Sequence, residues 1–159
     1  MSFSSELAAL FRRDLTKLAM QVRAFPKVEM LWEVPGAGVT NSAGNLAVHL
    51  EGNLREYIGR QLGGLEYTRV RDREFSDKGL GVEEVAGRID VLVDLIPGVV
   101  ASLTQEKLEA TYPENVLGAP LSTRQFLVHL QGHLNYHLGQ IDSMRRMLTG
   151  DGSLAYPRV

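Results

Sequence analysis

The sequence predicts an all-α fold, a four-helix bundle. Four stretches repeat apolar residues at the spacing of an amphipathic helix, and residues that start or stop helices bound each of them. The chain of 159 residues is 44% hydrophobic and 23% charged, which is ordinary for a globular protein with one core. Four such helices pack economically as a bundle, so we expect one domain over residues 1–159.

The first helix is expected over residues 4–25, where apolar residues recur at steps of three, four and seven. Pro26 stops it. After a segment rich in turn residues, a second helix begins near residues 40–42, whose hydroxyl and amide side chains can cap a helix start. The glycine pair at 63–64 ends this second helix.

The third helix is expected from near Gly81 to Leu103, because its apolar residues keep helical spacing throughout. We interpret Pro97-Gly98 within it as a kink rather than a stop, since the period continues through the pair. The fourth helix covers residues 122–148 and is the longest. Ser122 or Thr123 can cap its start, and a glycine at 150 closes it.

The connection over residues 64–80, GLEYTRVRDREFSDKGL, is charged and longer than a bundle requires. The connection EATYPENVLGAPLS before the fourth helix contains two prolines. Because long ordered loops often carry binding groups, we expect such groups in these connections, and in 64–80 especially.

Composition excludes several function classes. A net charge of −2 gives no general field for nucleic acid or an anionic membrane, so we expect neither as a partner. The first residues do not follow the order of a secretory signal, and no apolar run could cross a bilayer, so a cytoplasmic location is expected. With no cysteine, the chain must hold any metal through nitrogen and oxygen, and any thiol must come from a partner.

Two histidines of the fourth helix point to a metal. At 100° per residue, His133 and His137 lie inside the apolar sector of that helix, which is about 80° wide. Being four apart, they stack one turn above the other and can reach a single ion. The alternative is a pair of core histidines with satisfied hydrogen bonds. Each would then need its own partner within an apolar stripe, and that cost favours the ligand pair.

His49 is the natural third ligand, because it lies on the only other histidine-bearing helix, close to Asn53. His129 projects about 80° from His137, so we interpret it as a supporting or structural residue rather than a ligand. Gln140 projects about 60° from His137 and could orient a metal-bound water, although an interfacial amide explains it equally well. Asn53 and His129 are also candidates for substrate contact.

Three neutral histidines without a carboxylate or thiolate suit one divalent transition metal, zinc or nickel. Such a set leaves one or more coordination positions open. An open position distinguishes a catalytic or ligand-binding site from a closed structural one. A bound water of lowered pKa or a bound substrate thiolate would then be the reactive species.

Three segments, GNLAVHLEGNLREYI (44–58), TRVRDREFS (68–76) and HLQGHLNYHLGQI (129–141), together resemble the DinB-like (DinB/YfiT) superfamily. The resemblance implies helices arranged up-down-down-up, commonly a homodimer, and a metal in a cleft at one end. It assigns the metal to His49, His133 and His137, and not to His129. Some relatives are transferases or isomerases that use bacillithiol, mycothiol or glutathione, while many others have no known activity.

Five arginines, at positions 55, 60, 69, 71 and 73, cluster around the second helix and the charged connection. One hypothesis is that some of them, Arg71 and Arg73 among them, recognise the carboxylates of a low-molecular-weight thiol. The alternative is that the alternating charges pair with one another or with Glu56 and fix the loop.

Three functions therefore remain open from the sequence. The first is a metal-dependent enzyme of the thiol S-transferase or isomerase type, acting on a low-molecular-weight thiol. The second is a metal-bearing stress-response or ligand-binding module without chemistry. The third is a helical dimer whose histidines only fill a core.

Overall fold

A computed structural model describes residues 2–156, and this part of the chain is all-helical, as the sequence predicts. The long elements are α1 (Phe3–Arg23), α3 (Ala43–Leu54) continued by the π-helix η1 (Arg55–Arg60), α5 (Val82–Ala101) and α7 (Thr123–Thr149). Short helices lie in the connections: α2 (Val28–Leu31), α4 (Arg71–Ser76) and α6 (Gln105–Glu109). Among the described residues the only β-pairing is a single bridge between Thr111 and Ser122.

The helix boundaries follow from the caps. The Ser42 hydroxyl accepts a hydrogen bond from the Asn45 backbone N–H at 3.1 Å and starts α3. Ser122 caps α7 in the same way, through the Gln125 N–H at 3.1 Å. Gly150 ends α7 with a φ of 71°, a left-handed conformation that glycine adopts without a steric penalty.

Two helices test the predictions made from the apolar spacing: α5 agrees with them, and the second predicted helix differs. Helix α5 continues through Pro97 to Ala101, so the prediction that Pro97-Gly98 does not stop the helix is confirmed. The second predicted helix is not one regular α-helix, because η1 widens its last six residues into i→i−5 hydrogen bonding, for example from the Gln61 N–H to the Glu56 carbonyl at 3.2 Å. The spacing of apolar residues in the sequence does not reveal this π segment.

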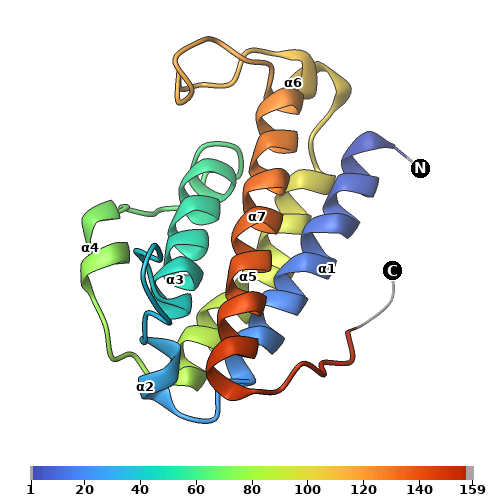
Figure 1. Ribbon diagram of the computed structural model, residues 1–159. Helices are drawn as coiled ribbons and strands as arrows, with labels where there is room; N and C mark the ends of the chain where they lie inside the picture. Colours follow the sequence, from blue (N-terminus) through green and yellow to red (C-terminus); the bar gives the residue numbers. More distant parts are fainter. Residues whose placement is uncertain (1, 157–159) are drawn as a thin grey trace.

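One hydrophobic core lies between the four long elements. Its fully buried members come from each of them and include Phe11, Leu15, Leu50, Leu54, Ile89, Ile96, Phe126 and Leu134. Helix α1 packs along α5, and α3 lies beside α7 with α4 on the outer side of α3 (Figure 1). No helix in the described range is apolar over enough length to cross a membrane.

A buried carboxylate fixes the rotation of α7. Asp14 of α1 is 0% exposed and accepts hydrogen bonds from Gln131 at 2.6 Å and Asn135 at 2.9 Å, both on α7. Burial alone would raise the pKa of the Asp14 carboxyl, but the hydrogen bonds from Arg13 and Asn135 outweigh it and hold that pKa below its usual range. Residues 131 and 135 are each two positions from His133, about 200° around the helix, and so lie on nearly the opposite face of α7. Their hydrogen bonds to α1 therefore direct the histidine face away from α1.

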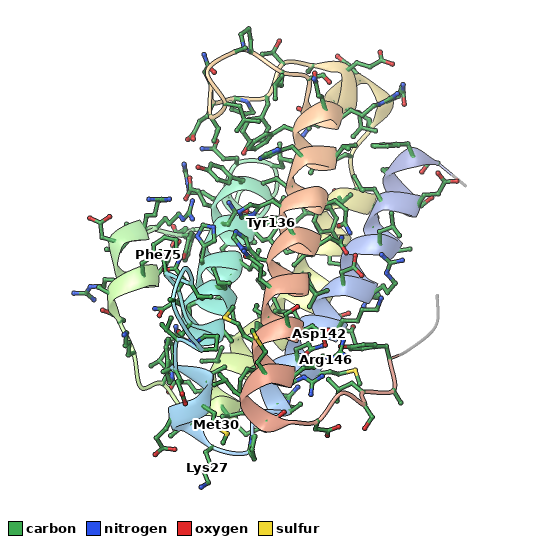
Figure 2. The ribbon with its side chains drawn as sticks, viewed as in Figure 1. Lys27, Met30, Phe75, Tyr136, Asp142 and Arg146 are labelled. Carbon is green, nitrogen blue, oxygen red and sulfur yellow. The ribbon has the colours of Figure 1, made fainter. Side chains whose placement is uncertain are left out.

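Nearer its C-terminal end, α7 is tied to α1 a second time. Gln21 of α1 donates to the Asp142 carboxylate at 2.6 Å and accepts from the buried Arg145 guanidinium at 2.6 Å. Figure 2 labels Asp142 on this part of α7. Together with Asp14, these contacts hold α7 against α1 along most of its length.

Candidate metal centre

Three histidines from two helices converge between α3 and α7. The Nε2 atom of His133 lies 3.2 Å from Nε2 of His49 and 3.1 Å from Nε2 of His137. One ring nitrogen from each residue lies within 4.8 Å of the other two, so the group could hold a metal ion. The spacing of four residues on α7 and the position of His49 on the facing helix, both inferred from the sequence, bring these side chains together.

Two of the three imidazoles are oriented by a partner at their other nitrogen. His49 Nδ1 lies 2.9 Å from the Glu74 carboxylate, and His137 Nδ1 lies 2.7 Å from the Gln140 side-chain oxygen. Both oxygens act only as hydrogen-bond acceptors. In a neutral imidazole the proton is therefore assigned to Nδ1, the nitrogen that faces the oxygen, in both rings. Their Nε2 atoms therefore present lone pairs to the space that the three rings share.

The donor set fits a divalent transition metal. A separation of 3.1–3.2 Å between two ring nitrogens suits either a hydrogen bond from a protonated His133 Nε2 or a cation between the rings. Two nitrogens about 2.05 Å from one ion are roughly 2.9 Å apart at an octahedral angle and about 3.3 Å apart at a tetrahedral one, so these two separations match such an ion. His133 Nδ1, in addition, is buried without a hydrogen-bond partner among the described residues.

The protonation state of the group also suits metal binding. Burial, together with the neighbouring histidines, lowers the pKa of His133 to about 4. Burial likewise lowers the pKa of His137, although the Gln140 hydrogen bond opposes this shift. Both rings are therefore neutral at pH 7, and a neutral imidazole is the form that coordinates a metal.

Glu74 is the functional residue that the sequence argument misses. It belongs to α4, is 5% exposed, and receives Arg69 Nε at 2.7 Å and Arg69 Nη2 at 2.8 Å in addition to His49. Burial by itself would raise the pKa of the Glu74 carboxyl, but these hydrogen bonds hold it below the usual range and keep the group ionised. A carboxylate behind a metal-ligating histidine fixes its tautomer and raises its basicity.

Gly52 gives Glu74 its place beside α3. A Cβ atom at Gly52 would lie 2.1 Å from Glu74 Oε1, closer than any real contact of that kind. Only a glycine one turn below His49 therefore lets the carboxylate approach the helix closely enough to reach the imidazole. Neither residue follows an apolar period, so the only signal in the sequence is the resemblance of their two segments to a known family.

The remaining candidate residues occupy different positions. His129 is exposed and stacks between Phe126, with ring centroids 5.8 Å apart, and His133, with centroids 6.3 Å apart, and it is outside the convergent group. Asn53 is 8% exposed, and its Oδ1 atom has no hydrogen-bond partner among the described residues.

The five arginines divide into two groups. Arg69 pairs with Glu74 in the connection, as the loop-fixing alternative expects, whereas Arg55 and Arg60 pair with Glu51 and Glu56 one turn earlier in their own helical segment. Arg71 and Arg73 are exposed, and the described residues provide neither with an ion-pair partner. Recognition of a carboxylate stays a prediction for Arg71 and Arg73.

A cleft of about 270 Å³ opens beside the histidines and is called the histidine cleft below. Its polar lining consists of His49, His133, His129, Asn53, Arg69 and Arg71. Its apolar lining consists of Tyr57, Val116, Leu117, Phe126 and Leu130. Val116 and Leu117 belong to the connection before α7, so that loop supplies one wall of the cleft. Two of the three candidate ligands, His49 and His133, thus line this concave space.

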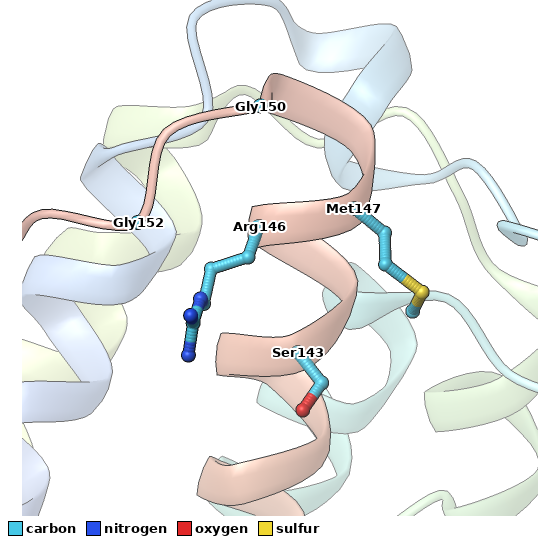
Figure 3. Close-up of a pocket in the computed structure, with 5 residues that line it drawn as sticks. All are labelled: Ser143, Arg146, Met147, Gly150 and Gly152. Carbon is cyan, nitrogen blue, oxygen red and sulfur yellow. The ribbon is translucent and has the colours of Figure 1, made fainter.

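The other hollows are less suited to chemistry. One of about 450 Å³ at the end of α7, lined by Ser143, Arg146, Met147, Gly150 and Gly152, contains neither a histidine nor a carboxylate (Figure 3). Arg146 lies 13 residues beyond His133, roughly 20 Å along the helix. A second, of about 300 Å³, lies behind Glu74 and includes Trp32, Tyr67 and Arg73.

Comparison with known families gives one match. The sequence model of the DinB superfamily matches residues 10–141. This segment extends from α1 into α7 and contains all three convergent histidines, Glu74 and Gln140. The search of curated proteins finds none that matches the chain.

Proposed function

Because the matched segment covers most of its length, the chain belongs to the DinB superfamily, and from this premise we propose that it is a metal-dependent thiol S-transferase acting on a low-molecular-weight thiol. The observation that carries the proposal is the convergence of three imidazole Nε2 atoms, two of them from His49 and His133, which line the histidine cleft. A ligand set of three neutral histidines leaves coordination positions free for a substrate atom.

His49, His133 and His137 would hold one divalent ion, zinc or nickel by the chemistry of the donors. Bound there, the metal would favour the thiolate form of a coordinated thiol, which is the nucleophile in S-transfer. Since the chain has no cysteine, the thiol must be a small molecule that enters from solution.

The protein's own residues would orient the site and limit access of water. Glu74 and Gln140 would keep the proton of His49 and His137 on Nδ1, so that both Nε2 atoms are directed toward Nε2 of His133. Apolar side chains, among them Val116, Leu117 and Phe126, cover the opposite wall and can pack against the aliphatic part of a substrate.

A test compares thiol consumption with and without metal. Untagged protein, loaded with zinc or nickel, is incubated with an electrophile and each of a panel of bacterial low-molecular-weight thiols, and thiol loss is followed. We expect metal-dependent loss with at least one thiol, absent in His133→Ala. Loss at equal rates in the metal-free protein would contradict the proposal.

A non-catalytic metal-bearing module is the second candidate. It is favoured by one observation: no carboxylate lines the histidine cleft, so its only proton acceptors are histidines. In that case a thiol would bind to the metal-loaded protein, and the electrophile would not react with any thiol of the panel.

The helix arrangement, the oligomeric state and the cellular location expected from the sequence are also part of the proposal. The up-down-down-up bundle is supported by Figure 1, in which α3 and α5 run opposite to α1 and α7. The homodimer is a proposal for light scattering to test. The cytoplasmic location is a proposal for cell fractionation to test.

A further inference from the structure

The charge of the histidine cleft is positive and not fully compensated. Arg69 and Arg71 are its charged residues, and its lining contains no aspartate or glutamate. The charge of Arg69 is balanced by Glu74, 2.7 Å away. Arg71 has no ion-pair partner among the described residues, so its guanidinium is available to a bound solute.

Acidic residues lie beside the cleft but do not pair with Arg71. The neighbouring hollow shares Tyr57, Arg69 and Arg71 with the cleft and adds Glu56 and Glu114. Both carboxylates are hydrogen-bonded to Arg60, Glu56 at 2.9 Å and Glu114 at 3.2 Å. Arg60 balances only one of these two carboxylate charges, but neither carboxylate forms an ion pair with Arg71, so its guanidinium stays unpaired where the two hollows meet.

Aromatic contacts hold Arg71 on the side of His49. Its guanidinium carbon lies 5.2 Å from the centroid of the Phe75 ring, within the range of a cation–π contact. The Phe75 ring in turn lies 4.9 Å from the ring of His49, and Figure 2 shows Phe75 on α4. A solute that reaches His49 therefore passes within reach of Arg71.

Asn53 adds a hydrogen-bond acceptor to the cleft. The residue is more than nine-tenths buried, lines the cleft, and has an Oδ1 atom without a partner in the described part of the chain. A buried acceptor without a donor is costly, and a ligand that donates an N–H or O–H would remove that cost.

We propose that the histidine cleft binds a small organic acid, with its carboxylate on Arg71 and an N–H or O–H of the same molecule donated to Asn53 Oδ1. Arginine binds carboxylates through two parallel hydrogen bonds, which suits it to this role. A volume of about 270 Å³ limits the part of the ligand inside the cleft to a small molecule. For a thiol ligand the proposal rests on the proposed function, whereas the preference for an acid does not.

The test uses cobalt-substituted protein, whose visible spectrum reports ligands at the metal. One probe pair is N-acetylcysteine and its amide, and the other is succinic acid monohydroxamate and its amide, all titrated at about 0.15 M salt. Arg71→Gln is compared with Arg73→Gln as a matched control. Arg73 is on the same short helix, is exposed and unpaired in the described structure, and lines the hollow behind Glu74 instead.

The measured quantity is the affinity for the acid divided by the affinity for its amide, because this ratio, compared between variants, cancels differences in thiol acidity. We expect the ratio to fall about tenfold in Arg71→Gln, the effect of losing one charge-assisted contact. It should change less than twofold in Arg73→Gln. An unchanged ratio in Arg71→Gln, or an equal fall in both variants, would overturn the proposal.

The two probe pairs separate the proposal from the proposed function. If neither thiol binds at the metal while the hydroxamates do, thiol transfer is wrong, and the hydroxamate ratio alone decides the role of Arg71. If the thiols bind but the ratio does not depend on Arg71, the acid preference is wrong and thiol transfer stands. Absence of binding by both pairs counts against both.

Discussion

Gly52→Ala should weaken metal binding although residue 52 cannot touch the metal. The added Cβ would lie 2.1 Å from Glu74 Oε1 and 2.9 Å from Glu74 Cδ. Real Cβ contacts do not fall below 3.0 Å, so the carboxylate must retreat by about 0.9 Å (3.0 minus 2.1). Since Oε2 of the same carboxylate forms the 2.9 Å hydrogen bond with His49, this displacement should lengthen and weaken that bond.

Loss of such a partner costs roughly 10–100-fold in metal affinity, or about 1.4–2.7 kcal/mol. The stability of the metal-free protein should change much less. Alanine is favoured over glycine within a helix by about 1 kcal/mol, which offsets part of the lost contacts between Glu74, Arg69 and His49. Metal affinity and stability are therefore expected to respond separately.

The assay is competition for zinc with a fluorescent chelator, alongside chemical unfolding of the metal-free protein. Gly132→Ala is the control, because Gly132 also lies within a helix, next to His133, and a Cβ there meets no atom within 4 Å. It should keep its zinc affinity and gain about 0.5–1 kcal/mol of stability. Zinc affinity of Gly52→Ala equal to that of Gly132→Ala would refute the role given to Glu74.

Three further outcomes are expected. Elemental analysis of untagged protein should find about one transition metal per chain in His129→Ala and none in His133→Ala; metal loss in both would mean that His129 is a ligand. Because the pKa of His133 is about 4 in the folded protein against 6.5 ordinarily, the unfolded chain takes up its proton first as the pH falls. The metal-free protein should thus lose about 1–2 kcal/mol of stability between pH 6.5 and 4, an amount reduced for partial exposure, and His133→Ala should remove that loss in chemical unfolding. Asp14→Ala leaves Gln131 and Asn135 without their acceptor and should lower the free energy of unfolding by about 3 kcal/mol, which lowers Tm by roughly 6–12 °C. Asp94, the exposed partner of Arg12, provides the control, because Asp94→Ala should change Tm little. Equal shifts of Tm in the two variants would contradict the role of Asp14.

The features that could be predicted from the sequence follow a helical period. His133 and His137 are four apart within an apolar stripe, so their shared face follows from helix geometry alone. Ser42 and Ser122 are recognisable as caps because serine at a helix start has a specific hydrogen-bonding role. His49 needs one more step, the packing of its helix against the fourth.

The features that could not be predicted depend on tertiary contacts. Glu74 and Arg69 lie in a charged connection without periodicity, and their role arises only because that connection folds back onto α3. Val116 and Leu117 are two apolar residues in a loop, and nothing local shows that they form a wall of the cleft. The distinction between Arg71, at the cleft, and Arg73, behind it, likewise depends on how the short helix α4 is oriented.

Binding of one metal ion through Nε2 of His49, His133 and His137 can be measured by X-ray absorption at the metal edge of zinc-loaded, untagged protein. We expect three imidazole nitrogens in the first coordination shell at about 2.0–2.1 Å, with one imidazole lost in His49→Ala. A first shell of oxygen atoms alone, or an unchanged imidazole count in that variant, would contradict it.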